Sequence, residues 1–219
     1  MSLLDQLNEI NAEIDIKHVS DPAFSLYGQV LEIPAESFEE VMTNKEVPEE
    51  GNVYVASDQE LEALAITAYI QEHIYGGFPV QAGYCNGNTA KMNAVEFHHG
   101  SEVNVACTDL ILFLGDRRRI ENRQYQTDDL KAFFIPKGTV IEVYSTTLHF
   151  APASVSDKGF KCIVILPEGT NTDQEGEAFP YVFAKNKWLL IHEEHEKMKQ
   201  RGALVGLAGK NHEIKHVKG

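Results

Sequence analysis

A series of short β-rich segments, from Pro79 to Pro167, constrains the fold of this chain more than any other feature. The segments read PVQAGYC, AVEFH, EVNVAC, DLILFLG, KAFFIP, TVIEVYS, HFAPASV and KCIVILP. Turn signals separate them, and no internal repeat or low-complexity tract interrupts the series. Strands at this spacing are typical of antiparallel sandwiches and barrels. The sequence therefore predicts a mainly β fold.

Helices are expected on both sides of this β region. Residues 3–13 place apolar side chains at helical spacing. A strand is predicted over Leu26 to Ile33, closed by Pro34, and a helix that Ser57 or Asp58 caps runs to about Tyr75.

The C-terminal part begins with a predicted exposed loop over residues 168–180, which are polar and rich in turn formers. The segment KNKWLLIHEEHEKMKQ then predicts a strand that leads into a helix. The Gly-rich tail is expected to pack on the core through Leu204 and Leu207. His192 and His195 do not form a metalloprotease HExxH motif, and a solvated charged helix is the simpler interpretation.

Composition narrows the possible partners. The 219 residues carry a formal net charge of −14, which argues against nucleic acid or an anionic membrane surface as a partner. The N-terminus lacks the basic start and apolar stretch of a signal peptide. Cys85, Cys107 and Cys162 form no CxxC pair, so we expect reduced, buried thiols in a cytoplasmic protein. Cys85 would be a nucleophile only with a base beside it, and the sequence indicates none.

Candidate metal ligands lie in the segment KMNAVEFHHGSEVN. If this segment is extended, Glu96, His98 and Glu102 share one face, and His99 lies on the other. Burying each of these groups without a partner costs several kcal/mol, and a bound divalent cation would remove that cost. His149 follows a predicted strand and a polar turn, and it is the best further ligand. A mixed nitrogen and oxygen set suits Zn, Mn, Fe or Ni. The alternative is a structural polar network with no ion.

These segments resemble the two sequence motifs of the cupin superfamily. The first family motif is HxH, three or four residues, and then Glu; here Glu96-Phe97-His98 is followed by three residues and Glu102. The second has a Gly, a turn and then His; here Gly138 precedes the turn STTL and His149. The resemblance places His98, Glu102 and His149 on three of the four family metal positions. Glu96 replaces the first His, as a ligand or as a base.

The resemblance implies a cupin jelly-roll barrel or sandwich with short helices at both ends. It divides a single domain, 1–219, into an N-terminal extension (1–78), a jelly-roll core (79–185) and a C-terminal helix and tail (186–219). The whole chain also resembles an uncharacterised bacterial cupin family in which GYCNG, the ExH…E segment and KNKWLL recur. Lyxose-type sugar isomerases are similar in placing a Lys where Lys91 stands. Ureidoglycolate lyase has an opening similar to AFSLYGQVLE.

Other residues are candidates for substrate contact or proton transfer. If GYCNGN lies at the barrel mouth, Tyr84, Asn86 and Asn88 are available to bind substrate; a plain hairpin turn is the alternative. Glu142 and Tyr144 share one strand face, and if that face is inward they line the pocket.

The leading hypothesis is a metal-dependent isomerase or epimerase of a sugar or sugar acid. A divalent cation would stabilise an enediolate, and Glu96, Glu142 or Lys91 would move the proton. The alternatives are a ureidoglycolate-type lyase, a cupin dioxygenase, or a cupin that binds a small metabolite without catalysis. A homodimer is expected, because cupin sandwiches commonly pair through their sheet edges.

Overall fold

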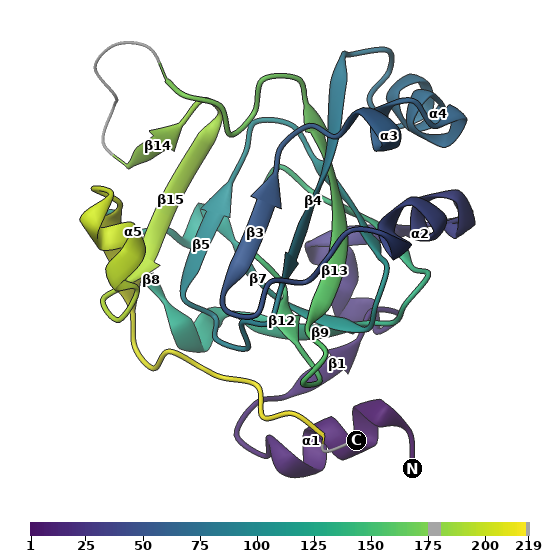
Figure 1. Cartoon of the computed structure of the whole chain (residues 1–219). Coiled ribbons are helices and arrows are strands. Elements are labelled where there is room, and N and C mark those ends of the chain that lie inside the picture. Colours follow the sequence, from purple (N-terminus) through teal and green to yellow (C-terminus); the bar gives the residue numbers. More distant parts are fainter. Residues whose placement is uncertain (175–180, 218–219) are drawn as a thin grey trace.

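Two facing β-sheets form the centre of the protein (Figure 1). The computed structural model describes residues 1–174 and 181–217, so residues 175–180 of the predicted loop lie outside the described part. The first sheet has the order β2 (Gly28–Leu31), β10 (Val140–Val143), β6 (Glu102–Ala106), β13 (Phe160–Pro167), β4 (Val80–Gly87), β3 (Asn52–Val55). The second has the order β1 (Ile16–His18), β9 (Lys131–Ile135), β7 (Leu110–Asp116), β11 (Thr147–Leu148), and β12 (Ala153–Ser154) also pairs with β7.

The strand order is that of a jelly roll. In the first sheet β4, β13, β6 and β10 are neighbours, and in the second β11, β7 and β9 follow one another. Strand β5 (Ala94–Phe97) joins the second sheet beside β11 through a bridge between Glu96 and His149. The chain thus crosses repeatedly between the two sheets, and β7 and β9 form an antiparallel pair within the second, which is the double Greek key of jelly rolls and cupins. The predicted mainly β fold is confirmed.

Alternation along each strand divides the core into layers. In β13, Cys162 and Val164 face the space between the sheets, whereas Ile163 and Ile165 face outward under the helices. Phe133 on β9 is fully buried in the same inner layer, where its ring packs against Phe24 at 5.3 Å between centroids. Both faces of β13 are therefore packed in apolar layers, which explains its continuous hydrophobic run CIVIL.

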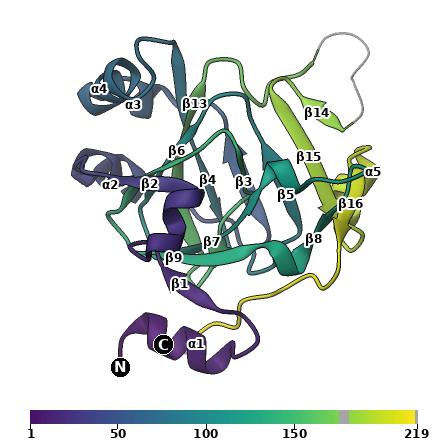
Figure 2. The ribbon, with the colours of Figure 1, turned by 180° about the vertical axis from the view of Figure 1, so that it is seen from behind.

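Three helices cover the outer face of the first sheet (Figures 1 and 2). They are α2 (Glu36–Thr43), α3 (Gln59–Glu62) and α4 (Ala65–His73). Asp58 caps α3 through the amides of Glu60 and Leu61, as predicted. The predicted single helix is broken, because Leu64 takes an extended conformation and starts α4 anew. Helix α2 was not predicted from the sequence, although its Phe38 and Met42 are fully buried.

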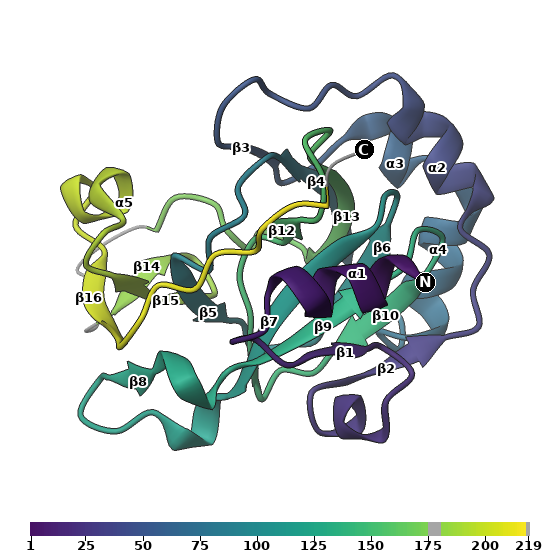
Figure 3. The same cartoon turned by 90° about the horizontal axis from the view of Figure 1, so that it is seen from below.

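The chain termini cover the outer face of the second sheet. Helix α1 (Leu3–Ile10) lies beside β1 and buries Leu7 completely (Figure 3). The C-terminal segment runs back alongside α1, where Asn11 bonds to both the amide and the carbonyl of Lys215. None of the described helices is long and apolar enough to cross a membrane.

A third sheet extends the jelly roll on the side of β5. Its order is β14 (Val182–Ala184), β15 (Lys187–His192), β16 (Leu204–Ala208), β8 (Tyr125–Gln126), and β5 pairs with β15. Helix α5 (Glu196–Gln200) lies between β15 and β16 in sequence. The predicted strand followed by a helix is confirmed, and the tail is a strand whose Leu207 is buried.

The inner layer supports a stability prediction. Replacing Phe133 with Ala leaves a cavity between the sheets and is expected to lower the free energy of unfolding by about 3–5 kcal/mol. Phe78→Ala is the matched control, because that ring is 73% exposed and its loss is expected to cost no more than about 0.5 kcal/mol. Urea denaturation followed by circular dichroism measures both, and equal midpoints for the two variants would contradict this layer assignment.

Candidate metal centre

His98 presents an unsatisfied nitrogen to the interior. The residue directly follows β5, and its side chain is 1% exposed. Its Nδ1 lies 2.7 Å from the carbonyl oxygen of Asn186, and because a carbonyl only accepts, Nδ1 carries the proton. The lone pair of Nε2 therefore points away from Asn186, and this buried atom has no hydrogen-bond partner in the described structure. A carbonyl that accepts from the other ring nitrogen, and so fixes the tautomer, is typical of metal-binding histidines.

His149 is oriented in the same way. Its Nδ1 lies 3.2 Å from the carbonyl of Thr147, so Nε2 faces inward, 3.2 Å from Oε2 of Glu102. The backbone of His149 is fixed against β5, because its amide donates to the carbonyl of Glu96 and its carbonyl accepts from the amide of Glu96. This reciprocal pair makes Glu96 and His149 direct cross-strand neighbours.

Each of the two glutamates has one oxygen anchored and the other directed to the histidines. Oε1 of Glu102 accepts from the amide of Asn104 at 2.8 Å, and Oε2 lies 3.6 Å from Nε2 of His98. Glu96 forms an ion pair with Lys187 through Oε2, and its Oε1 lies 3.7 Å from the same nitrogen of His98. All four side chains are more than nine-tenths buried.

The spacing of these donor atoms fits a metal ion. One ligand atom from each of Glu96, His98 and His149 lies within 4.8 Å of the others, and Oε2 of Glu102 is 3.2 and 3.6 Å from the two imidazole nitrogens. Ligand atoms about 2.1 Å from a tetrahedral ion lie about 3.4 Å apart. Two imidazoles and two carboxylates suit Zn, Mn, Fe or Ni. A divalent ion here would supply the missing partner of the His98 nitrogen.

Charge coupling within the group determines the ionisation of its members. Burial alone would raise the pKa of Glu96, but the Lys187 and histidine charges outweigh it and hold that pKa well below its usual range. Burial also opposes ionisation of Glu102, whose pKa is nevertheless lowered, chiefly by His149. Burial would lower the pKa of His149, whereas Glu102 and Glu96 raise it. The two carboxylates therefore favour a proton on His149, and metal binding through its Nε2 would oppose that proton.

The structure corrects the assumption that residues 91–104 form one extended stretch. Strand β5 ends at Phe97, and the chain turns at Gly100, whose φ of 104° is left-handed. Glu102 then begins β6 in the facing sheet. The predicted ligands do come together, but across the two sheets rather than along one strand face.

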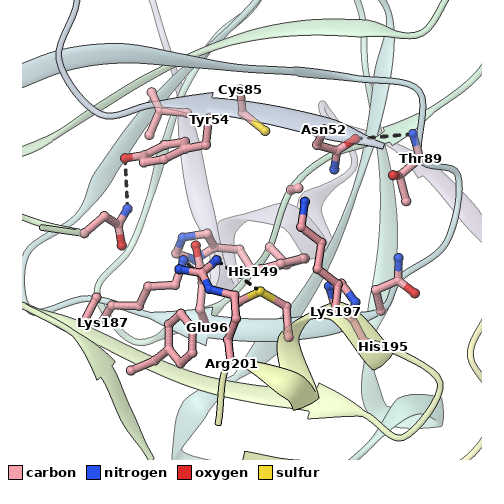
Figure 4. Close-up of a pocket in the computed structure, with 18 of the residues that line it drawn as sticks. Asn52, Tyr54, Cys85, Thr89, Glu96, His149, Lys187, His195, Lys197 and Arg201 are labelled. Atoms are coloured by element: carbon pink, nitrogen blue, oxygen red, sulfur yellow. Dashed lines mark hydrogen bonds and ion pairs between the residues drawn. The ribbon is translucent and has the colours of Figure 1, made fainter. Parts of the chain in front are cut away.

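Glu96, Glu102 and His149 line a cavity of about 590 Å³ between the sheets and the third sheet (Figure 4). This volume is within the range of small-molecule sites, about 300–1,000 Å³. Amide and hydroxyl side chains contribute to its wall, among them Asn52, Tyr54 and Thr89. The arrangement places a candidate metal centre in contact with a polar pocket.

Two of the predicted proton-transfer residues lie elsewhere. The Nζ of Lys91 is 3.3 Å from Glu194, and Lys91 does not line the cavity. Glu142 is on the outward face of β10, where its Oε2 accepts from the amide of Gln29 at 2.7 Å. Tyr144 follows the same strand, shares that outward face and is also outside the cavity lining.

The predicted substrate-binding residues of GYCNGN are also outside the cavity lining. This segment is part of β4 through Gly87, so the hairpin-turn alternative is wrong as well. Cys85 faces the cavity, and the period of two therefore turns Tyr84 and Asn86 to the opposite face. The amides of Asn86 and Asn88 donate to the carbonyls of Glu46 and Pro48, which tie down the loop before β3.

Several residues of the C-terminal part of the chain line the cavity but were not predicted from the sequence. Lys187 comes from the recurring segment KNKWLL, whose Asn186 also holds His98. The resemblance quoted for KNKWLL was the one signal in the sequence that pointed to Lys187 and Asn186. His195, Lys197 and Arg201 line the cavity from α5 and its flanks. The charged side chains of this short helix are exposed, as a solvated helix implies, but its place beside the cavity was not predicted.

This fold and this site define a jelly-roll protein of the cupin type with a candidate metal centre between its sheets. The chain belongs to the family described as "Domain of unknown function (DUF4867)", whose model matches residues 16–212. No curated protein matches the chain.

Solved structures show only distant similarity. A variant of Bacillus subtilis oxalate decarboxylase OxdC is 10% identical over 44% of this chain and 24% of its own, with a TM-score of 0.31. The Fe(II)-HppE structure is 18% identical over 39% and 41% of the two chains, with a TM-score of 0.30. Salicylate 1,2-dioxygenase from Pseudoaminobacter salicylatoxidans is 11% identical over 40% and 20%, with a TM-score of 0.29. The aligned regions span well under two thirds of each of these proteins.

Metal content tests the centre directly. Elemental analysis of protein purified without a His tag or chelator is expected to find close to one equivalent of a divalent metal. His98→Ala and His149→Ala are each expected to abolish it, because each removes an oriented nitrogen. His99→Ala is the matched control, since that neighbouring imidazole is exposed. Metal-free wild type, or variants that keep their metal, would contradict the assignment; circular dichroism verifies folding.

The thiols give a second prediction. Burial, and then the charges of Glu96 and Glu102, raise the pKa of Cys85 to about 12. Burial raises the pKa of Cys107 and Cys162 as well. Because the thiolate is the reactive form, iodoacetamide at pH 8 is expected to leave the folded protein unlabelled and to modify all three cysteines in denaturant. Mass spectrometry counts the adducts, and fast labelling of Cys85 in the folded state would show that it is activated.

Proposed function

We propose that this protein is a metal-dependent isomerase or epimerase of a small polyhydroxylated substrate. The observation that carries the proposal is the ion pair of Lys187 with Glu96 beside His98, His149 and Glu102, in a cavity with a polar wall. A bound divalent cation supplies Lewis-acid stabilisation of negative charge on substrate oxygens. The remaining chemistry belongs to the side chains of the chain itself.

In this proposal His98, His149 and Glu102 would hold the ion, and Glu96 and Lys187 move the proton. The lowered pKa of Glu96 keeps its carboxylate ionised and able to accept a proton. In isomerisation the C–H bond next to the substrate carbonyl breaks, and its proton moves to Glu96 and then to the former carbonyl carbon. The hydroxyl proton of the first carbon passes to the former carbonyl oxygen, and the first carbon becomes the new carbonyl. Lys187 is positioned to donate a hydrogen bond to the oxygen on which charge develops, and its own charge keeps Glu96 oriented. No oxidant or reductant is needed.

The wall of the cavity supports a substrate rich in hydroxyl groups. Asn52 and Thr89 are joined by a hydrogen bond between the Asn52 side chain and the Thr89 amide. The hydroxyl of Tyr54 is held by the amide of Asn171 at 2.9 Å. Fixed amides and hydroxyls of this kind bind sugar hydroxyls at little cost in side-chain ordering. A lyase acting on a similar hydroxylated substrate is the alternative that shares this support.

A substrate screen with two lysine variants tests the proposal. The metal-loaded protein is incubated with pentoses, hexoses and uronic acids in D₂O, and NMR detects new isomers and deuterium at the exchanged carbon. Lys187→Gln is expected to lower kcat by about 10²–10⁴, the usual contribution of a positioned proton donor or acceptor, while metal content stays unchanged. Lys91→Gln is the control, because this lysine pairs with Glu194 outside the cavity.

Two outcomes would overturn the proposal. Absence of turnover and of deuterium exchange with every sugar, in a metal-loaded protein that binds one of them, would indicate a binding protein. Loss of activity in Lys91→Gln but not in Lys187→Gln would show that the proposal names the wrong lysine for proton transfer.

A further inference from the structure

Positive charges gather at the cavity of an otherwise acidic protein. The chain carries a net charge of −14, yet Lys187, Lys197 and Arg201 all line the cavity. Lys197 belongs to α5, and Arg201 follows it by one turn of helix. Figure 4 shows these side chains around the same space as Glu96 and His149. Cations that line a cleft raise the local concentration of anions there.

Arg201 is held by neighbouring side chains, and neither Arg201 nor Lys197 is neutralised by an acidic group in the part of the chain that the structure describes. The guanidinium of Arg201 lies 5.2 Å from the ring centroid of Phe183, and its Nη1 is 3.6 Å from Sδ of Met198. Neither Arg201 nor Lys197 forms an ion pair with a carboxylate among the described residues. Lys199 on the same helix does, with Glu196 at 3.3 Å. The two cavity cations therefore keep their donors available for a ligand.

The charge balance of the cavity also leaves room for an anion. A divalent ion would balance the charges of Glu96 and Glu102. Lys187, Lys197 and Arg201 would then face Asp173, which is the one further acidic residue among the described residues that line the cavity. The remaining excess is positive, and an anionic group on the ligand would neutralise it.

We propose that the ligand of this cavity is a polyhydroxylated acid whose anionic group, a carboxylate or a phosphate, is bound by Lys197 and Arg201. This inference rests on the proposed function for the hydroxylated remainder of the ligand. Arg offers a planar pair of donors and Lys a mobile point charge, a combination suited to either oxyanion. His195 lines the same wall, where burial and then the charge of Lys197 lower its pKa, so its neutral imidazole is available to a hydroxyl group.

Binding of three matched compounds tests the inference. D-glucitol, D-gluconate and D-glucitol 6-phosphate share a hydroxylated chain, and none has a carbonyl that can isomerise. Isothermal titration calorimetry of the metal-loaded protein is expected to show at least about tenfold tighter binding of gluconate or of the phosphate ester than of glucitol, with the advantage shrinking as salt is raised. The better ligand of the two identifies the anion.

Variants on and near α5 locate the binding group. Lys197→Gln and Arg201→Gln are each expected to weaken binding of the preferred anion about tenfold or more, because each removes a charge-assisted hydrogen bond. Binding of glucitol and metal content are expected to stay unchanged in both variants. Lys199→Gln is the matched control and should bind all three compounds like the wild type.

The outcomes separate this inference from the proposed function. Equal affinity for the three compounds, or equal losses in Lys199→Gln and the two cavity variants, overturns the anion site even when sugars are turned over. Anion binding that depends on Lys197 and Arg201 in a protein that exchanges no proton on any sugar supports the anion site and overturns the isomerase.

Discussion

The site depends on one pair of backbone hydrogen bonds between Glu96 and His149. These bonds, 2.6 and 3.0 Å long, connect β5 to the end of β11 and so attach the third sheet to the jelly roll. They also hold a carboxylate and an imidazole directly opposite each other, on neighbouring strands that are 53 residues apart in sequence. Because β15 pairs with the other edge of β5, the position of Lys187 is set by the same strand. The candidate centre is thus built into the ladder of the sheet and not carried on a flexible loop.

Four titratable groups buried together would be costly without this framework. Each has a fixed partner on its outer side: the Asn186 carbonyl for His98, the Thr147 carbonyl for His149, the Asn104 amide for Glu102 and Lys187 for Glu96. The remaining nitrogen or oxygen atom of each side chain faces the centre of the group. Among the histidine nitrogens there, Nε2 of His98 has no hydrogen-bond partner within the described part of the chain. Hydrogen bonds on the outer side therefore orient the group for a cation at its centre, which is the usual construction of a metal site. Asn186 is suited to its position because its φ of 57° is left-handed, a conformation that Asn tolerates better than most residues.

The sequence predicted the strands of the jelly roll and the residues of the centre for a physical reason: both depend on local spacing. Alternation and turn signals mark β4 to β13, and the positions of His98, Glu102 and His149 follow from two short motifs. Orientation on β4 was not predictable in this way. Helices cover one face of its sheet and the second sheet covers the other, so both faces are buried and the pattern of hydrophobic residues does not distinguish them. Tyr84 and Asn86 were expected to bind substrate from the barrel mouth, whereas it is Cys85 between them that faces the cavity.

Lys187 could not be predicted from local spacing, because its partner Glu96 lies about ninety residues earlier, on the neighbouring strand β5. Lys91, which lies just upstream of the first motif, was predicted to move the proton instead. Its nearness in sequence does not bring it to the cavity. The third sheet explains why. It supplies Lys187, Lys197 and Arg201 to one wall, while the jelly roll supplies the two glutamates and two histidines to the other. The jelly roll therefore carries the metal-type group, and strands β14 to β16 with α5 carry the cations beside it. Because a fold does not determine a ligand, the choice of ligand in the proposed function is expected to depend on β14 to β16 and α5, which supply the cations that line the cavity.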